Sequence, residues 1–251
     1  MKGSIVLSET QDYPILRQIL QCGFVTHDQL YRFMRLSFHE RSRMSFNNRM
    51  RRLAKHSIVT QVYSPLVAGS RHYSLPTETA VALAGRGPLY VGAITGLEKR
   101  RERDALAHAI ELNEIHLALG GSGLLVRWKP EVEIRAQNER SDFGHPKDYD
   151  AVVTVQGPHG EARFALEYER TPKKESQYIE ILGKLEKETR VSCVLYLSPT
   201  HYTLSQISKW FRHARPTVVF GAAPEFCREL LDTRVTGPRH TFPVALSKIL
   251  S

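Results

Sequence analysis

Residues 148–170 read DYDAVVTVQGPHGEARFALEYER, and this stretch decides the fold of the second half of the chain. Residues 149–155 and 162–169 are rich in β-branched and apolar residues, which predicts two neighbouring strands. The segment between them, residues 157–160, is short and rich in Gly and Pro, as in the turn of a β-hairpin. We therefore expect a hairpin at the centre of an α/β domain.

Three acids mark the inner ends of this hairpin. Asp150 opens the first strand, and Glu167 and Glu169 close the second. Because side chains alternate along a strand, Glu167 and Glu169 point to the same face. If Asp150 meets that face, three carboxylates converge, and like charges at short range raise each other's pKa. Such a group of oxygen ligands suits Mg²⁺ or Mn²⁺. The alternative is a salt-bridge network between these acids and the nearby cations Arg163, Arg170 and Lys173.

The acids also carry a resemblance to a family. An Asp at the start of one hairpin strand and Glu-x-acid at the end of the next resembles the PD-(D/E)xK nuclease-like core. More narrowly, YDA at 149–151 together with LEYERT at 166–171 resembles the replication-relaxation family of plasmids and mobile elements. In that family a winged helix precedes a nuclease-like domain. The segment 108–113 resembles the helix that leads into this domain.

The resemblance implies a site for metal-dependent cleavage of DNA. Its metal ligands would be Asp150 and Glu167, and Mg or Mn would be the metal. Tyr149 stands where the usual pattern has Pro, and Glu169 stands where a catalytic Lys is expected. A Lys from the start of the next helix would then have to reach back, either Lys174 or its neighbour Lys173. The long helix before the hairpin would add an acid, with Glu111 and Glu114 as candidates, although an acid on such a helix is usually solvated.

The N-terminal quarter is predicted to be a winged helix-turn-helix. Helical spacing of apolar residues indicates helices over residues 12–21 and 27–36, with Thr26 as the N-cap of the second. A third helix is expected over about 40–56. Two short strands, 58–63 and 71–75, joined by a Gly-containing loop, complete the order.

The third helix has the composition of a DNA-contacting helix. It carries six Lys or Arg residues and no acid between Arg41 and His56. A solvated helix face usually mixes signs, whereas six charges of one sign repel one another unless a polyanion neutralises them. The predicted DNA-contacting residues, including the base of the wing, are Arg41, Arg43, Asn47, Asn48, Arg49, Arg51, Arg52, Lys55, Arg71 and His72. The alternative is a protein-docking winged helix.

A length of 251 residues suggests one large domain or two small ones, and the order of the predicted elements favours two. The expected division is a winged helix over 1–86, a Gly- and Pro-containing linker over 87–96, and the nuclease-like domain over 97–251. That domain would form a restriction-endonuclease-like α/β sandwich on a mixed sheet. We expect its long helix over 97–119, strands over 124–128, 131–136, 191–197 and 217–221, and helices over 175–189, 203–212 and 224–231.

The net charge of +9 favours an anionic partner such as nucleic acid. No apolar run is long enough for a transmembrane helix, and the start of the chain lacks the apolar content of a signal peptide. A cytoplasmic location is therefore expected. Two functions follow from the sequence. The first is a DNA-binding protein of plasmid or mobile-element biology, acting in replication, relaxation or transcription, with a homodimer as one form. The second is a metal-dependent endonuclease targeted to duplex DNA by its winged helix.

Overall fold

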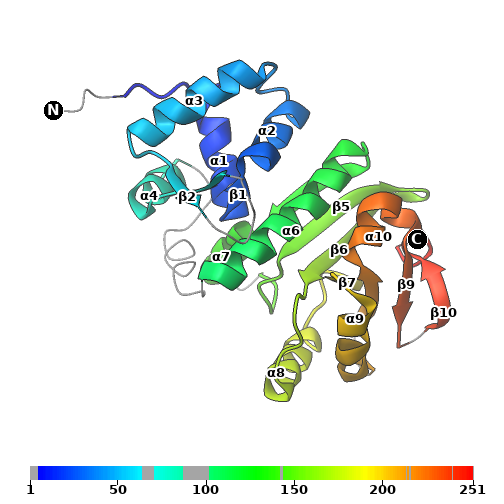
Figure 1. The fold of residues 1–251 in the computed structure, drawn as a ribbon. Coiled ribbons are helices and arrows are strands. Elements are labelled where there is room, and N and C mark those ends of the chain that lie inside the picture. The colour runs from blue at the N-terminus through cyan, green and yellow to red at the C-terminus, as the bar shows by residue number, and fades with distance from the viewer. Residues whose placement is uncertain are drawn as a thin grey trace. The chain divides into compact units, whose positions relative to one another are not determined.

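The structure is a computed structural model of the whole chain (Figure 1). The residues that it describes are 5–63, 71–86, 102–141, 144–212, 214, 216–238 and 240–250. The chain divides into two compact units, Met1–Leu117 and Ala118–Ser251. The predicted linker, 87–96, and the loop of the wing, 64–70, lie outside the described residues, so the predicted domain boundary stays a prediction.

The first unit begins with three helices and a small antiparallel sheet. In chain order its elements are α1 (Asp12–Cys22), β1 (Val25–Thr26), α2 (His27–Leu36), α3 (Arg43–Lys55), β2 (Thr60–Tyr63), β3 (Arg71–Ser74) and α4 (Thr77–Ala84). The sheet order is β1-β3-β2, with β3 antiparallel to both neighbours. This is the predicted order of three helices and a hairpin, with one short strand added between α1 and α2.

Local sequence explains where these helices begin. Thr26 caps α2 by accepting a hydrogen bond from the backbone of Gln29, and the Gln29 side chain accepts one from the backbone of Thr26. This reciprocal capping box satisfies two amides that the first turn of a helix leaves free. Along α3, Phe46, Met50 and Leu53 form the buried stripe that the spacing predicts.

A long helix, α6 (Glu102–Gly121), packs against the first unit through residues up to Leu117. The side-chain amide of Gln29 donates to the carbonyl of Ile110 and to the Glu114 carboxylate, both at 2.8 Å. The amide of Asn113 donates to the carbonyl of Phe24 at 2.9 Å. These partly buried polar contacts tie α6 to α2 and to Phe24, which precedes that helix.

The second unit is built on a seven-stranded mixed sheet. Its elements are β4 (Leu125–Pro130), α7 (Glu131–Arg140), β5 (Ala151–Gly157), β6 (Gly160–Tyr168), α8 (Glu175–Leu185), β7 (Cys193–Ser198), α9 (His201–Ser208), β8 (Thr217–Ala222), α10 (Ala223–Glu229), β9 (Arg234–Gly237) and β10 (His240–Ala245). The strand order is β10-β9-β8-β7-β6-β5-β4. β6, β7 and β8 run parallel, and the strands on either side pair antiparallel. The predicted α/β class with a mixed sheet is therefore confirmed.

One face of this sheet is covered by α8 and α9. Tyr178 and Leu185 of α8 and Ile207 of α9 pack in one cluster with Val152 of β5 and Val194 of β7. Near-continuous apolar composition suits strands that are buried on both faces. The core therefore lies around the parallel centre of the sheet.

The structure of this unit differs from the sequence-based prediction in two places. Residues 131–136, predicted as a strand from their alternation, form the first part of helix α7. The acids Glu131 and Glu133 lie in its first turn, directly after Pro130, where they interact favourably with the helix dipole. The strands β9 and β10 were not predicted. Among the described residues, no helix is long and apolar enough to cross a membrane.

Candidate functional site

The basic side chains of α3 fall into two groups. Arg51 and Lys55 are exposed, as is Arg41 just before the helix, and Arg43 is partly exposed. Arg49 and Arg52 instead turn toward α1, where both bind the buried carboxylate of Asp12. Of these two, Arg49 lies inside the unit, whereas Arg52 keeps 42% of its side chain exposed.

Two of the predicted DNA-contacting side chains lie below the surface. The Arg49 side chain is only 11% exposed and forms ion pairs with Asp12 at 3.4 Å and with Glu40 at 3.6 Å. His72 is fully buried on β3. Sequence alone could not separate these residues from the exposed ones, because their partners come from other elements. Asn48 is exposed, and Asn47 is half-buried.

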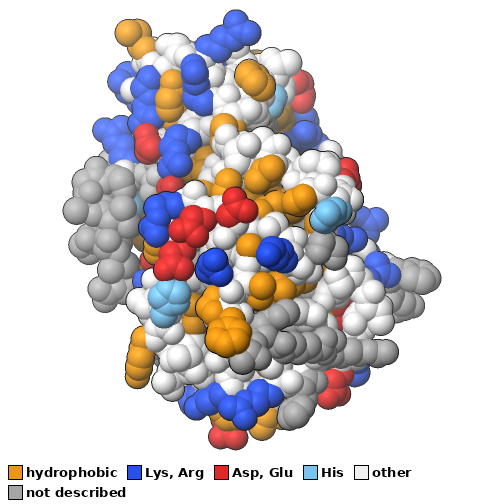
Figure 2. All heavy atoms as spheres, turned by 90° about the vertical axis from the view of Figure 1, so that its right-hand side faces the viewer, with side chains coloured by type: hydrophobic (Ala, Val, Ile, Leu, Met, Phe, Trp, Pro, Cys, Tyr) orange, Lys and Arg blue, Asp and Glu red, His pale blue; other side chains and the backbone are white. Residues whose placement is uncertain are grey.

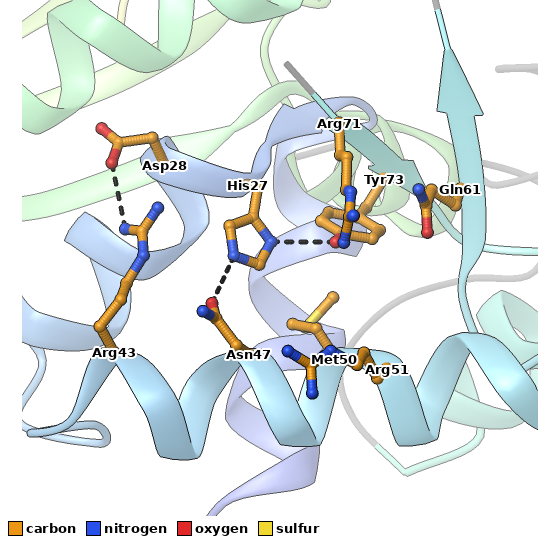
Figure 3. A pocket seen from close by; sticks show the side chains of 9 residues that line it. All are labelled: His27, Asp28, Arg43, Asn47, Met50, Arg51, Gln61, Arg71 and Tyr73. Atoms are coloured by element: carbon orange, nitrogen blue, oxygen red, sulfur yellow. Dashed lines mark hydrogen bonds and ion pairs between the residues drawn. The ribbon is translucent and has the colours of Figure 1, made fainter. Parts of the chain in front are cut away.

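A pocket of about 450 Å³ lies between α3, the start of α2 and the β2–β3 hairpin. Its lining residues are His27, Asp28, Arg43, Asn47, Met50, Arg51, Gln61, Arg71 and Tyr73. Figure 3 shows Asn47 pointing from α3 to His27 and Arg43 pointing to Asp28, while Arg71 comes from the hairpin on the same side as Tyr73. Sequence reasoning found the cations of this pocket and missed His27 and Tyr73, whose role depends on the packing of α2 against β3.

His27 joins two elements across this pocket. Its Nε2 lies 2.8 Å from Oδ1 of Asn47 on α3, and its Nδ1 lies 2.9 Å from the hydroxyl of Tyr73 on β3. Burial lowers the pKa of His27, and the charges of Arg43 and Arg71 lower it further. The neutral imidazole therefore donates from Nε2 to Asn47 and accepts at Nδ1 from Tyr73.

The surface around this pocket is rich in cations. Lys and Arg side chains gather over the first unit, in the upper part of Figure 2. Arg43 pairs with Asp28 at 3.1 Å and stacks over the ring of Tyr31 at 4.5 Å. Both groups of the Arg43–Asp28 pair are substantially exposed, so solvent screens this pair and leaves the local charge available to a ligand.

The three acids of the hairpin lie at neighbouring positions at one end of strands β5 and β6. Ala151 of β5 pairs with Leu166 of β6 in antiparallel register. Asp150 and Glu167 each lie one residue beyond this pair, so they are at opposing positions of the two strands. The Asp150 carboxylate accepts a hydrogen bond from the backbone amide of Tyr168 at 2.7 Å. Glu167, almost fully buried, forms an ion pair with Lys147. Burial raises the pKa of Glu167 to about 7, with Lys147 opposing the rise and Asp150 adding to it.

Glu169 has a lysine partner of its own. It is buried and pairs with Lys173, while burial raises its pKa. Lys174, the other lysine considered, is exposed at the N-cap of α8. Lys147 was missed, although its place three residues before Asp150 is a signal that sequence reasoning can use. Each of the two glutamates therefore has one lysine beside it.

The loop that carries Lys147 and Asp150 is held by α7. Asn138 accepts a hydrogen bond from the backbone of His145 and donates one to Asp148, both at 2.7 Å. Gly144 lies so close that a Cβ atom there would be 2.8 Å from Cα of Asn138. His145 in turn lies 3.1 Å from Glu188, which also accepts from the hydroxyl of Tyr149 at 3.0 Å. The described part of this loop is thus held by hydrogen bonds to Asn138 and Glu188.

In this structure the glutamates of the hairpin are paired with lysines. No group of three or more His, Cys, Asp or Glu side chains in the described part of the chain is arranged to hold one. Lys147 and Lys173 supply the positive charge at Glu167 and Glu169. The buried hydroxyl of Tyr196 has no hydrogen-bond partner among the described residues. Burial raises the pKa of Tyr196, so this hydroxyl stays neutral and adds no negative charge for a metal ion. Glu114, considered as an added acid, binds Arg32 and Gln29 instead.

The comparisons with known proteins identify the family. No curated protein and no solved structure matches the chain. Residues 16–190 match the family model described as replication-relaxation. The match begins within α1, spans both the basic helix and the acidic hairpin, and covers more than half of the 251 residues. The chain therefore belongs to the replication-relaxation family.

Proposed function

We propose that the protein binds duplex DNA through its first unit, with α3 and the β2–β3 hairpin as the contact surface of a winged helix. The family suggests a role in the replication or relaxation of plasmids or mobile elements. Within that role the protein acts as an accessory factor or as a transcriptional regulator. The second unit is then a nuclease-like domain that supports binding without cutting.

The observation that carries this proposal is the exposed, single-signed surface of α3. Arg51, Arg52 and Lys55 are exposed on α3, which contains no acid, while Arg41 precedes the helix and Arg71 adds a cation from the hairpin. A helix of this kind fits the major groove, and cations beside it fit the phosphates. Neutralising phosphates releases counterions, which stabilises the complex at low salt.

Fluorescence anisotropy with labelled duplexes at several KCl concentrations tests the proposal. We expect log Kd to rise linearly with log salt, with a slope close to the number of phosphates contacted. Arg86→Ala provides a control for net charge, because Arg86 pairs with Glu9 away from the pocket. The absence of binding at low salt would remove the proposed function.

Endonuclease activity is the second candidate, and it requires a metal ion at the acids. Because Lys147 and Lys173 already neutralise Glu167 and Glu169, we do not assign this activity. Incubation of supercoiled DNA with the protein and Mn²⁺ gives a direct test. Cleavage that is lost in both Asp150→Asn and Glu167→Gln would overturn this part of the proposal.

A further inference from the structure

The pocket beside α3 presents hydrogen-bond donors to whatever enters it. The Oδ1 atom of Asn47 accepts from His27, so the free edge of this amide is its NH₂ group. Arg43, Arg51 and Arg71 contribute guanidinium groups, which only donate. The one carboxylate in the lining, Asp28, is paired with Arg43. A ligand that suits this lining is rich in acceptors and negatively charged.

The place of the pocket on the helix favours a phosphate over a base edge. Arg43, Asn47 and Arg51 follow one another at i, i+4 and i+8, so they form one stripe of α3. That stripe faces His27 and the β2–β3 hairpin (Figure 3). Met44 and Asn48 directly follow Arg43 and Asn47 in the sequence, and they are exposed on another face of the helix. The outward face is suited to enter a groove, and the stripe beside the hairpin is suited to follow the DNA backbone.

The contact between His27 and Asn47 also argues against adenine as the ligand. An asparagine reads adenine with both ends of its amide, accepting from N6 and donating to N7. Here one lone pair of Oδ1 already accepts from Nε2 of His27 at 2.8 Å, and this bond fixes the orientation of the amide. The donating end can still bind a phosphate oxygen.

We propose that this pocket binds one phosphate of the DNA backbone through Arg43, Arg51, Arg71 and the amide of Asn47, and that His27 is a positioning residue that orients Asn47. The inference rests on the proposed function and names the ligand of its contact surface. His27 touches no phosphate in this arrangement. His27 holds the Asn47 amide with its NH₂ group free to donate, and Tyr73 holds His27 on its other side.

The test uses the full chain, several duplexes of unrelated sequence and a series of KCl concentrations. Arg71→Ala should weaken binding to every duplex and reduce the salt slope by about one. Asn47→Ala should weaken binding about tenfold on every duplex, the loss of one hydrogen bond to a charged group, and leave the slope unchanged. Losses that depend on base sequence would overturn the proposal, because they indicate base reading.

His27 is tested by comparing single and double variants. His27→Phe keeps a ring for packing against Phe46, whose ring centroid lies 4.9 Å away, and removes both hydrogen bonds. It should reproduce the loss seen in Asn47→Ala, and the double variant should lose no more than either single one. Additive losses would show that His27 does not act through Asn47. His27→Leu, which also lacks hydrogen-bonding groups, serves the same purpose if the Phe variant does not fold.

A separate measurement distinguishes this inference from the proposed function. Inorganic pyrophosphate should raise the melting temperature of the wild type, because it binds only the folded state, and should do so less in Arg71→Ala. If the wild type binds no duplex and yet shows this difference, the proposed function fails and the phosphate pocket stands. If it binds duplexes while Arg71→Ala and Asn47→Ala change nothing, the pocket proposal fails alone.

Discussion

The buried carboxylate of Asp12 on α1 lies 3.4 Å from Nη1 of Arg49 on α3. The same carboxylate binds Arg52 and accepts the backbone amide of Ser8 at 2.8 Å. The buried Asp12 therefore neutralises two cations of α3, Arg49 and Arg52. The positive charge of α3 serves both the fold and the surface.

Asp12→Ala should destabilise the first unit by about 1–3 kcal/mol, because Arg49 and the backbone amide of Ser8 both lose a buried acceptor, while Arg49 keeps its second partner Glu40. Chemical unfolding followed by circular dichroism measures this loss. Asp28→Asn is the matched control, since Asp28 is exposed and its pair with Arg43 contributes about 0–1 kcal/mol. Equal effects of the two substitutions would contradict the assignment of Asp12 as an internal anchor.

Acid should weaken the same contact. Burial raises the pKa of Asp12, but the amide of Ser8 and the charge of Arg52 lower it more, so the net pKa lies below the ordinary value. A lowered carboxyl pKa gives stability that is present above the unfolded value and lost as the pH falls through the folded one. The wild type should therefore lose stability below about pH 4 more steeply than Asp12→Asn in unfolding curves measured at each pH.

Arg51→Ala should affect DNA binding, whereas Arg49→Ala should affect stability. Arg51 is exposed, so its loss should weaken DNA binding and reduce the salt slope by about one. Arg49 is almost buried, so its loss should reduce stability while leaving the slope of the folded protein unchanged. Anisotropy titrations below the melting temperature of both variants make the comparison. A reduced slope in Arg49→Ala would place that side chain on the DNA.

Gln29→Ala should destabilise the contact between α2 and α6. The Gln29 side chain is buried, and its loss leaves the carbonyl of Ile110 and the amide of Thr26 without these partners. An unsatisfied buried polar group costs about 1–3 kcal/mol. Urea unfolding of this variant beside Gln11→Ala, whose side chain is exposed, measures the difference. No difference would show that α6 is not held through these bonds.

Glu167→Gln should change how stability depends on pH. The folded pKa of Glu167 is about 7, above the ordinary value of 4.5, so the folded state holds this proton more tightly. The burial cost is then absent below pH 4.5 and complete above about pH 7, where it reaches roughly 3 kcal/mol. Relative to the Gln variant, the wild type should lose stability across that window. Glu161→Gln, an exposed acid on the same strand, is the control, and parallel curves for wild type and Glu167→Gln would contradict this account.

Local signals in the sequence predicted much of the fold. The start of α2 follows from Thr26 as a cap, and the structure has this helix at the predicted residues, His27–Leu36. The hairpin of β5 and β6 follows from its composition and its turn. These features depend on neighbouring residues alone, which is why one sequence suffices.

The details of the candidate sites depend on contacts between distant residues. Arg49 and Arg51 have the same chemistry, and only the position of Asp12 on another helix makes one an anchor and leaves the other exposed. Lys147 reaches Glu167 because a loop folds back over the strand ends. The alternation in 131–136 was interpreted as a strand, although Pro130 followed by two acids is also a signal for the start of a helix.

Gly144 shows how a residue without functional chemistry sets the geometry of the acidic hairpin. A side chain there cannot fit beside Asn138, so any substitution must push away the loop that carries Lys147 and Asp150. In a screen for loss of function, Gly144 and Asn138 would then score beside the acids while contributing no charged group. A map of inactivating substitutions in this unit would therefore show the residues that position the acids as clearly as the acids themselves.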